Sequence, residues 1–79
     1  MEKVIISNNI RKLRFNADEM TQQELADKSG VTRQTIVAIE QGKYYPSLDL
    51  AFRLARVFNS HLEEVFTYNY EEKSKTGEK

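Results

Sequence analysis

The sequence has 79 residues, enough for one small domain and too few for two. Twelve Lys and Arg balance twelve Asp and Glu, so the formal net charge is zero and the overall charge does not suggest a polyanionic partner. The absence of cysteine excludes a disulfide framework, a thiolate nucleophile and a cysteine-ligated zinc site.

The first predicted element is a short strand at residues 4–6, where three β-branched residues follow one another. A short amphipathic helix that includes Ile10 follows, and Ser7 or Asn8 is the expected capping residue at its start. The polar residues 16–19 are expected to connect this helix to the next one.

Two helices with clear start and stop signals come next. Thr21 is a strong N-cap candidate, and Glu24 three residues later completes a capping box. Gly30 supplies the positive φ that ends this helix. Thr32 caps the second helix, and Gly42 is its expected C-cap.

The last third of the chain predicts two more helices and a second strand. Ser47 caps a helix that Asn59 ends, and residues 61–65 form a short fifth helix. Residues 66–70 alternate aromatic and polar side chains, which favours a strand, and residues 71–79 lack apolar side chains and are expected to form a flexible tail. The apolar residues of the helix after Ser47 recur with helical spacing: Leu50, Leu54, Val57 and Phe58, of which Phe58 is expected in the core.

Residues 21–43, TQQELADKSGVTRQTIVAIEQGK, form two short helices joined by a turn at Gly30. This is the pattern of a helix-turn-helix, in which the N-terminal residues of the second helix meet base edges in the major groove.

The sequence resembles the Cro/CI-type helix-turn-helix family, the XRE-like repressors, over about residues 8–66. The caps, the glycine turn, the Ile39–Glu40 pair and the Pro46–Ser47 helix start all fall in register with the family pattern. The resemblance implies an all-α, five-helix, lambda-repressor-like DNA-binding domain over residues 1–70, here with short terminal strands. Its helix-turn-helix would be residues 21–43 and its recognition helix residues 32–41. The connection at residues 16–19 departs from the family, because it is longer and has no glycine.

Base contacts are expected from the start of the recognition helix. Arg33 suits guanine and Gln34 suits adenine, because each can form a bidentate pair of hydrogen bonds with that base. Val37 and Ala38 lie one turn further along, and Val37 could pack on a thymine methyl group. The alternative is an ordinary solvated helix surface.

Phosphate contacts are expected from two places that the resemblance implies: the N-terminus of the helix capped by Thr21, and the segment after the recognition helix. Free N–H groups and the helix dipole favour an anion at such an N-terminus. A solvated surface remains the alternative. The candidates are Gln22, Thr35, Lys43 and Tyr44, with Asn8 and Arg11 as weaker ones.

Arg14 and Glu40 match the family's structural ion pair, which would fix the angle of the recognition helix against the first helix. His61 is interpreted as a cap or surface residue rather than a metal ligand, because a single histidine makes a weak site.

The aromatic surplus of the C-terminal third suggests a dimer interface. The alternative is that the two terminal strands pair within one chain, and both arrangements can hold together. The expected interface residues are Ile5, Leu62, Phe66 and Tyr68.

The sequence thus predicts a sequence-specific, double-stranded DNA-binding transcriptional regulator that acts as a homodimeric repressor on an operator. No nucleophile–base pair, cofactor motif or small-molecule site is apparent, so we do not expect an enzyme. With no apolar run long enough to span a bilayer and no signal-peptide pattern, a cytoplasmic location is expected. The alternative is a protein-interaction module such as an antitoxin-type regulator, in which apolar residues would be expected in place of Arg33 and Gln34.

Overall fold

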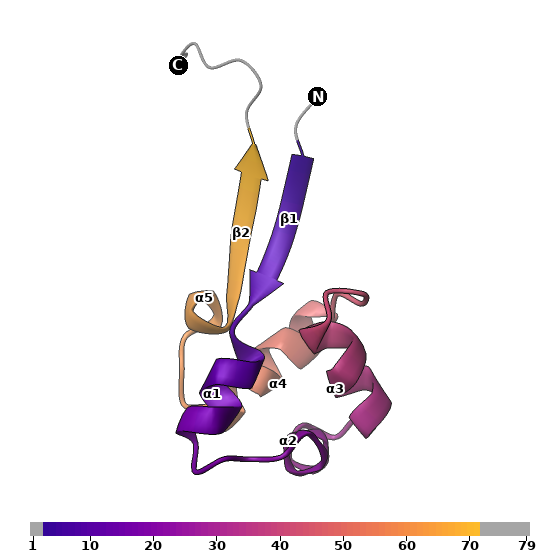
Figure 1. Ribbon diagram of the computed structural model, residues 1–79, viewed down its shortest axis with the longest axis vertical. Helices are drawn as coiled ribbons and strands as arrows, with labels where there is room; N and C mark the ends of the chain where they lie inside the picture. Colours follow the sequence, from indigo (N-terminus) through magenta and orange to yellow (C-terminus); the bar gives the residue numbers. More distant parts are fainter. Residues whose placement is uncertain (1–2, 72–79) are drawn as a thin grey trace.

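The computed structural model describes the backbone of residues 3–71 and the side chains of residues 5–69 (Figure 1). In this part of the chain, five helices form the body of the molecule and two strands form a ribbon that rises from it. The fold is the predicted all-α domain with short terminal strands. The elements are β1 (Lys3–Asn8), α1 (Ile10–Asn16), α2 (Gln22–Ser29), α3 (Arg33–Glu40), α4 (Leu48–Val57), α5 (Leu62–Val65) and β2 (Phe66–Glu71).

The core draws on all five helices, because each contributes the apolar side of its surface. Ile10, Leu25, Ile36, Leu54 and Val65, one from each helix, are completely buried. In α4 the buried positions recur every three or four residues, which is the helical period. Phe58, expected in the core, is only partly buried and packs against its edge.

The two strands pair with each other in antiparallel register within the chain, from Lys3 opposite Glu71 to Asn8 opposite Phe66. Hydrogen bonds fix the foot of this ribbon to the helices. The backbone N–H of Asn9 donates to the carbonyl of Val65 at 2.9 Å, and the Asn8 amide donates to the carbonyl of Ile39 at 3.0 Å. The ribbon is therefore anchored to both α5 and α3.

Several predicted boundaries differ from the structure. The first helix is capped by Asn9 rather than by Ser7 or Asn8, because the chain stays extended as far as Asn8 to pair with Phe66. The C-cap of α3 is Gln41, and Gly42 follows it at φ 76°.

Two further boundaries, both near the C-terminus, differ from those predicted from the sequence. The fifth helix begins at Leu62 with His61 as its N-cap, and His61 is exposed, in line with the cap or surface interpretation. The second strand extends to Glu71, so that residue belongs to the ribbon rather than to the expected tail; residues 72–79 lie outside the described part of the chain.

The connection between α1 and α2 turns through two consecutive left-handed residues, Asp18 at φ 64° and Glu19 at φ 58°. Neither is glycine, and a side chain in this region costs about 1–2 kcal/mol. Surrounding contacts hold the turn: the N–H of Glu19 donates to the carbonyl of Phe15, and Arg14 Nη1 donates to the carbonyl of Met20 at 2.9 Å. These hydrogen bonds thus hold the glycine-free connection in place against the cost of its two left-handed residues.

Candidate nucleic-acid interface

Helices α2 and α3 form the predicted helix-turn-helix, and their caps define its geometry. Thr21 and Glu24 form a complete capping box: Thr21 Oγ1 accepts from the N–H of Glu24 at 3.0 Å, and Glu24 Oε1 accepts from the N–H of Thr21 at 2.8 Å. Thr32 Oγ1 accepts from the N–H of Thr35 at 3.2 Å. Gly30 between them has φ 78°. These local bonds fix where each helix begins.

The turn between the two helices is also held from α4. Arg53 Nη1 donates to the carbonyl of Ser29 at 2.7 Å, and Arg53 Nη2 pairs with Asp49 at 2.8 Å. A Cβ at Gly30 would lie 3.2 Å from Arg53 Nη1, so the turn and the guanidinium fit closely. Arg53 had no predicted role, because its partner is a backbone carbonyl of another helix.

The first turn of α3 presents its polar side chains to solvent. Arg33 and Gln34 are exposed, and no hydrogen bond engages either side chain among residues 5–69. Val37 and Ala38 are half-buried, whereas Ile36 and Ile39 face the core. The expected base-contact residues therefore lie on the outer side of α3.

The expected phosphate-contact residues fall into two classes. Lys43 and Tyr44 are exposed in the loop after α3. Gln22 Nε2 instead donates to Glu40 Oε1 at 3.2 Å, and the hydroxyl of Thr35 bonds with that of Thr32 at 3.0 Å. The latter two thus have intramolecular partners in the unbound protein.

The two weaker candidates for phosphate contacts, Asn8 and Arg11, differ in their surroundings. Asn8 holds the foot of the ribbon, since its Oδ1 accepts from the N–H of Ile10 while its amide donates to Ile39. Arg11 is exposed on α1 and lines the cleft beside α3. Only Arg11 is placed to meet an external ligand.

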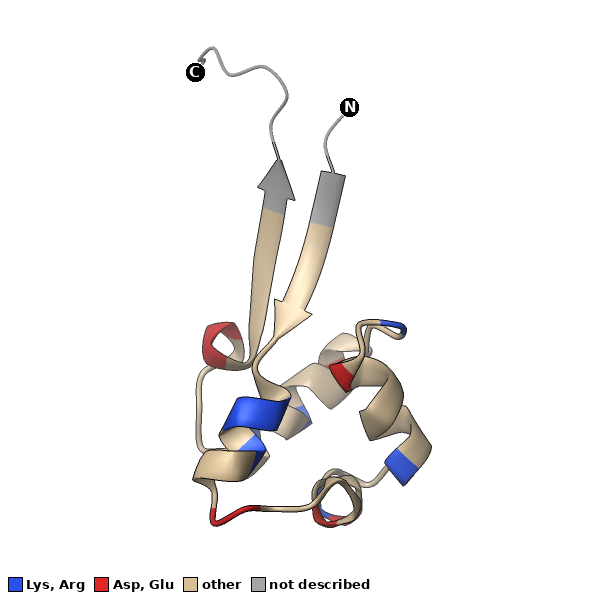
Figure 2. Ribbon diagram, viewed as in Figure 1, with Lys and Arg blue, Asp and Glu red and all other residues tan. Residues whose placement is uncertain are grey.

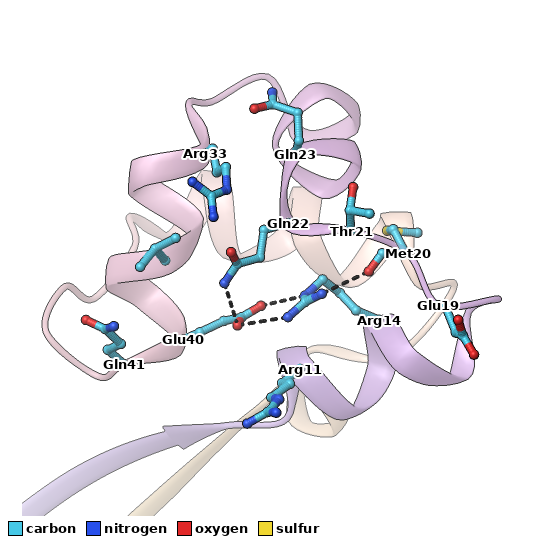
Figure 3. Close-up of a pocket in the computed structure, with 11 residues that line it drawn as sticks. Arg11, Arg14, Glu19, Met20, Thr21, Gln22, Gln23, Arg33, Glu40 and Gln41 are labelled. Atoms are coloured by element: carbon cyan, nitrogen blue, oxygen red, sulfur yellow. Dashed lines mark hydrogen bonds and ion pairs between the residues drawn. The ribbon is translucent and has the colours of Figure 1, made fainter.

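Arg14 and Glu40 form a bidentate ion pair between α1 and α3 (Figure 3). Arg14 Nε lies 2.6 Å from Glu40 Oε2, and Arg14 Nη2 donates to Glu40 Oε1 at 3.1 Å. The side chains are only 15% and 10% exposed. With the Gln22 bond, the Glu40 carboxylate joins three helices: α1, α2 and α3.

A cleft of about 670 Å³ opens over this ion pair, between α1, the start of α2 and α3. Arg11 and Arg33 contribute cationic side chains, and Glu19 contributes an acidic one. Because Arg14 and Glu40 neutralise each other, the remaining lining is slightly basic. The sequence prediction did not include Gln23 and Gln41, two amide side chains within the helix-turn-helix that also line the cleft.

Many of the charges that cancel in the total lie on different elements. Figure 2 shows basic residues on α1, at the start of α3 and in the following loop. Acidic residues lie on the connection before α2, on α2 itself and on α5. The zero net charge therefore conceals a basic contribution next to the recognition helix.

The four residues expected at a dimer interface do not form one surface. Paired residues share a face of a ribbon, so Ile5 lies with Asn69, and Tyr68 lies with Ile6 on the opposite face. Leu62 and Phe66 are half-buried beside Ile6. Thus Leu62, Phe66 and Tyr68 belong to one side of the molecule and Ile5 to the other.

Among the described residues, no group of three or more His, Cys, Asp or Glu side chains is placed to hold a metal ion. None of the described helices is both long and apolar enough to cross a membrane.

The sequence is similar to those of several known proteins. The helix-turn-helix family model matches residues 10–65, the full span from α1 to α5. An uncharacterized HTH-type transcriptional regulator of Archaeoglobus fulgidus is 52% identical over 61 residues, which cover 77% of this chain and 82% of the relative. One from Methanocaldococcus jannaschii is 55% identical over 53 residues, covering 67% and 80%. One from Bacillus subtilis is 41% identical over 61 residues, covering 77% and 91%.

Proposed function

Because this chain belongs to the helix-turn-helix family of DNA-binding transcriptional regulators, we propose that it is a cytoplasmic, sequence-specific repressor that binds double-stranded operator DNA as a homodimer. It acts by occupying the operator and has no catalytic activity of its own.

The exposed first turn of α3 is the observation that carries this function. Among residues 5–69, no hydrogen bond engages the long polar side chains of Arg33 and Gln34, while Ile36 and Ile39 bury the opposite side of the helix. Insertion of this turn into the major groove brings a guanidinium and an amide to base edges at no cost in broken hydrogen bonds. Val37 and Ala38 then meet bases one turn further along.

Contacts to phosphates flank these base contacts. Lys43 and Tyr44 bind the backbone on one side of the recognition helix, and the N-terminus of α2 binds it on the other. The Gln22 amide carries two N–H groups, so it can donate one to a phosphate while the other stays on Glu40. Thr35 adds a hydroxyl, and Arg11 adds a cation from α1.

Two copies bind two half-sites about one DNA turn apart, roughly 10 base pairs between centres. This arrangement compensates for the modest charge of each copy, because specificity then rests on base contacts made twice. Of the four residues proposed for the interface, Leu62, Phe66 and Tyr68 lie on a common side, and Ile5 lies on the other face of the ribbon.

Selection of bound sequences from a random duplex library tests the proposal directly. We expect a two-fold symmetric motif with half-site centres about 10 base pairs apart. Replacement of Arg33 and Gln34 by Ala should weaken binding to the selected duplex by about 30- to 20,000-fold, at about 1–3 kcal/mol for each bidentate pair, while binding to unrelated duplex changes little. Arg56→Ala removes an exposed cation on α4, away from the cleft, and serves as the matched control.

Fluorescence anisotropy at several salt concentrations supplies the second criterion. Phosphate contacts require that affinity fall as salt rises, since cations are released from DNA on binding. Complete absence of salt-sensitive binding to any duplex would refute the DNA-binding function. Equal loss of specific and unrelated binding in the double variant would refute the assignment of Arg33 and Gln34.

A further inference from the structure

Phe15 is the most exposed large apolar side chain among residues 5–69. It is 67% exposed, on the last turn of α1 and outside the core. A phenyl group in water costs free energy that contact with another apolar surface recovers. Single exposed apolar residues are common on proteins, so the surroundings of Phe15 decide what it can contact.

The side chain of Phe15 lies beside the cleft over the Arg14–Glu40 pair. It lines an open hollow of about 260 Å³ together with four other residues: Arg11, Arg14, Glu19 and Met20. All four of these residues also line the cleft. The hollow is therefore a lateral extension of the cleft, and a ligand that enters the cleft at this end passes Phe15.

Arg11 and Phe15 share one side of α1. They are four residues apart on this helix, so their Cβ atoms lie about 5–6 Å from each other on neighbouring turns. Ile10 is fully buried on the core side of the same helix, whereas Arg11 is exposed. A guanidinium and a phenyl group thus stand side by side along the flank of α1 that borders the cleft.

We propose that Phe15 packs on a deoxyribose of the DNA backbone, next to the phosphate that Arg11 contacts. This inference rests on the proposed DNA-binding function and adds a contact of a different kind. The other proposed backbone contacts are polar or ionic, whereas Phe15 contributes an apolar contact that is independent of base sequence. The contribution of α1 then extends beyond the single cation of Arg11.

The charges around this hollow fit a nucleic-acid strand. The Arg14–Glu40 pair is neutral, which leaves Arg11 and Arg33 against Glu19 along the lining of the cleft. Figure 3 shows Glu19 and Arg33 on opposite sides of the ion pair, so the carboxylate lies away from this cation. A phosphate suits the cationic part of the cleft. A sugar, which carries no charge, suits the hollow, where Arg11 and Glu19 balance each other.

The repeat of a DNA strand matches the spacing of the two side chains on α1. Each nucleotide adds about 3.4 Å along the duplex axis and carries one phosphate and one sugar. Side chains about 5–6 Å apart can therefore reach a phosphate and the sugar beside it. A protein partner lacks this alternation of anionic and uncharged groups at a fixed short repeat. The arrangement therefore favours a DNA strand as the occupant.

The expected contribution to affinity follows from the area of the phenyl group. About 200 Å² for a complete aromatic side chain and an exposed fraction of 67% leave roughly 130 Å² of Phe15 in water. A sugar that covers one face of the ring removes about half of this area from water, which corresponds to a roughly tenfold change in affinity.

Phe15→Ala tests the contact, with Phe52→Ala as its matched control. Both residues are exposed phenylalanines on helices, at 67% and 53%, but Phe52 lies on α4 and lines neither the cleft nor the hollow. Fluorescence anisotropy should show a roughly tenfold loss for Phe15→Ala on the selected duplex and on an unrelated duplex alike. Phe52→Ala should change little on either duplex. Thermal unfolding followed by circular dichroism establishes that each variant is folded.

The salt dependence of binding separates an apolar contact from an ionic one. A phenyl group releases no cations from DNA, so Phe15→Ala should leave the slope of log K against log salt unchanged, whereas Arg11→Ala should reduce it by about 0.9. Phe15→Leu should retain most of the wild-type affinity, because an aliphatic side chain also packs on a sugar but cannot stack on a base.

Hydroxyl-radical footprinting provides a direct measurement, because these radicals cleave DNA where a deoxyribose is accessible to solvent. We expect the wild-type protein to protect the sugar beneath Phe15 in each half-site. Phe15→Ala should restore cleavage at that position, and Phe52→Ala should leave the protection unchanged. Identical footprints for the wild type and Phe15→Ala would overturn the proposed contact.

The outcomes distinguish this inference from the proposed function. If Phe15→Ala binds every duplex as tightly as the wild type, the inference is overturned and the DNA-binding function stays intact. A loss confined to the selected duplex, or an equal loss with Phe15→Leu and Phe15→Ala, also overturns it, because the ring would then contact a base. A wild-type protein without salt-sensitive binding to any duplex refutes the proposed function itself, and the inference with it.

Discussion

Replacement of Glu40 by Gln removes the charge that joins α1 to α3. Its carboxylate accepts two hydrogen bonds from Arg14 and one from Gln22, and the paired side chains are only 15% and 10% exposed. After the substitution the Arg14 guanidinium keeps its charge in a partly buried place without a counter-ion. Breaking a fully buried pair costs about 3–5 kcal/mol, and the remaining exposure here lowers the expected cost to about 2–3 kcal/mol.

We expect this loss of free energy of unfolding to produce a large change in thermal stability. A domain of this size loses about 4–8 °C of Tm per kcal/mol, so we expect Glu40→Gln to lower the Tm by about 10–20 °C. Circular dichroism during a thermal scan measures it. The control is Asp49→Asn, which removes one charge from the exposed Arg53–Asp49 pair and should cost less than about 1 kcal/mol.

The sequence preference distinguishes a structural role from direct base recognition. Well below its Tm, the Glu40→Gln variant should select the same DNA motif as the wild type, because Glu40 lies under the cleft rather than at the exposed first turn of α3. Equal melting temperatures for Glu40→Gln and Asp49→Asn would show that the ion pair does not fix the helices. A changed motif with unchanged stability would contradict the structural role altogether.

Three further predictions concern the turns and the DNA backbone. Glu19→Gly should raise the Tm by a few degrees, since removal of the side chain at φ 58° relieves about 1 kcal/mol of strain, and a thermal scan that shows a lower Tm would contradict this. Gly30→Ala should cost about 1–3 kcal/mol, because the new Cβ meets positive φ and lies 3.2 Å from Arg53 Nη1; unchanged denaturant unfolding would refute that close fit. Lys43→Ala should weaken binding to all duplexes alike and reduce the slope of log K against log salt by about 0.9, as measured by anisotropy; a loss confined to one sequence would assign Lys43 to a base instead.

The helices of this protein were predictable because their signals are local. Thr21 and Glu24 of the capping box are three positions apart, the glycine turn directly follows α2, and the apolar period lies within single helices. The ion pair of Arg14 and Glu40 was expected only through the family resemblance, since 26 residues separate the partners. The boundary at Ser7 and Asn8 was wrong because strand pairing with residues near the C-terminus overrode the local capping preference.

The functional surface was predictable only in part. Arg33 and Gln34 follow a cap, so their exposure on the first turn of α3 could be inferred from position alone. The partners of Gln22 and Asn8 could not, because each bonds to α3 across 18 or 31 residues of chain. The apolar groove beside the foot of the ribbon was equally inaccessible, since residues of both strands, a loop and two helices meet there.

The sequence by itself therefore determined the helices, the helix-turn-helix and its outward-facing residues, since helix caps and apolar periodicity act between near neighbours. Only the tertiary structure decided which polar residues are already engaged, that Ile5 and Tyr68 lie on opposite faces, and where the apolar surplus of the C-terminal third gathers. Those outcomes depend on strand register and on helix packing, which bring together residues whose spacing along the chain carries no signal of their contact.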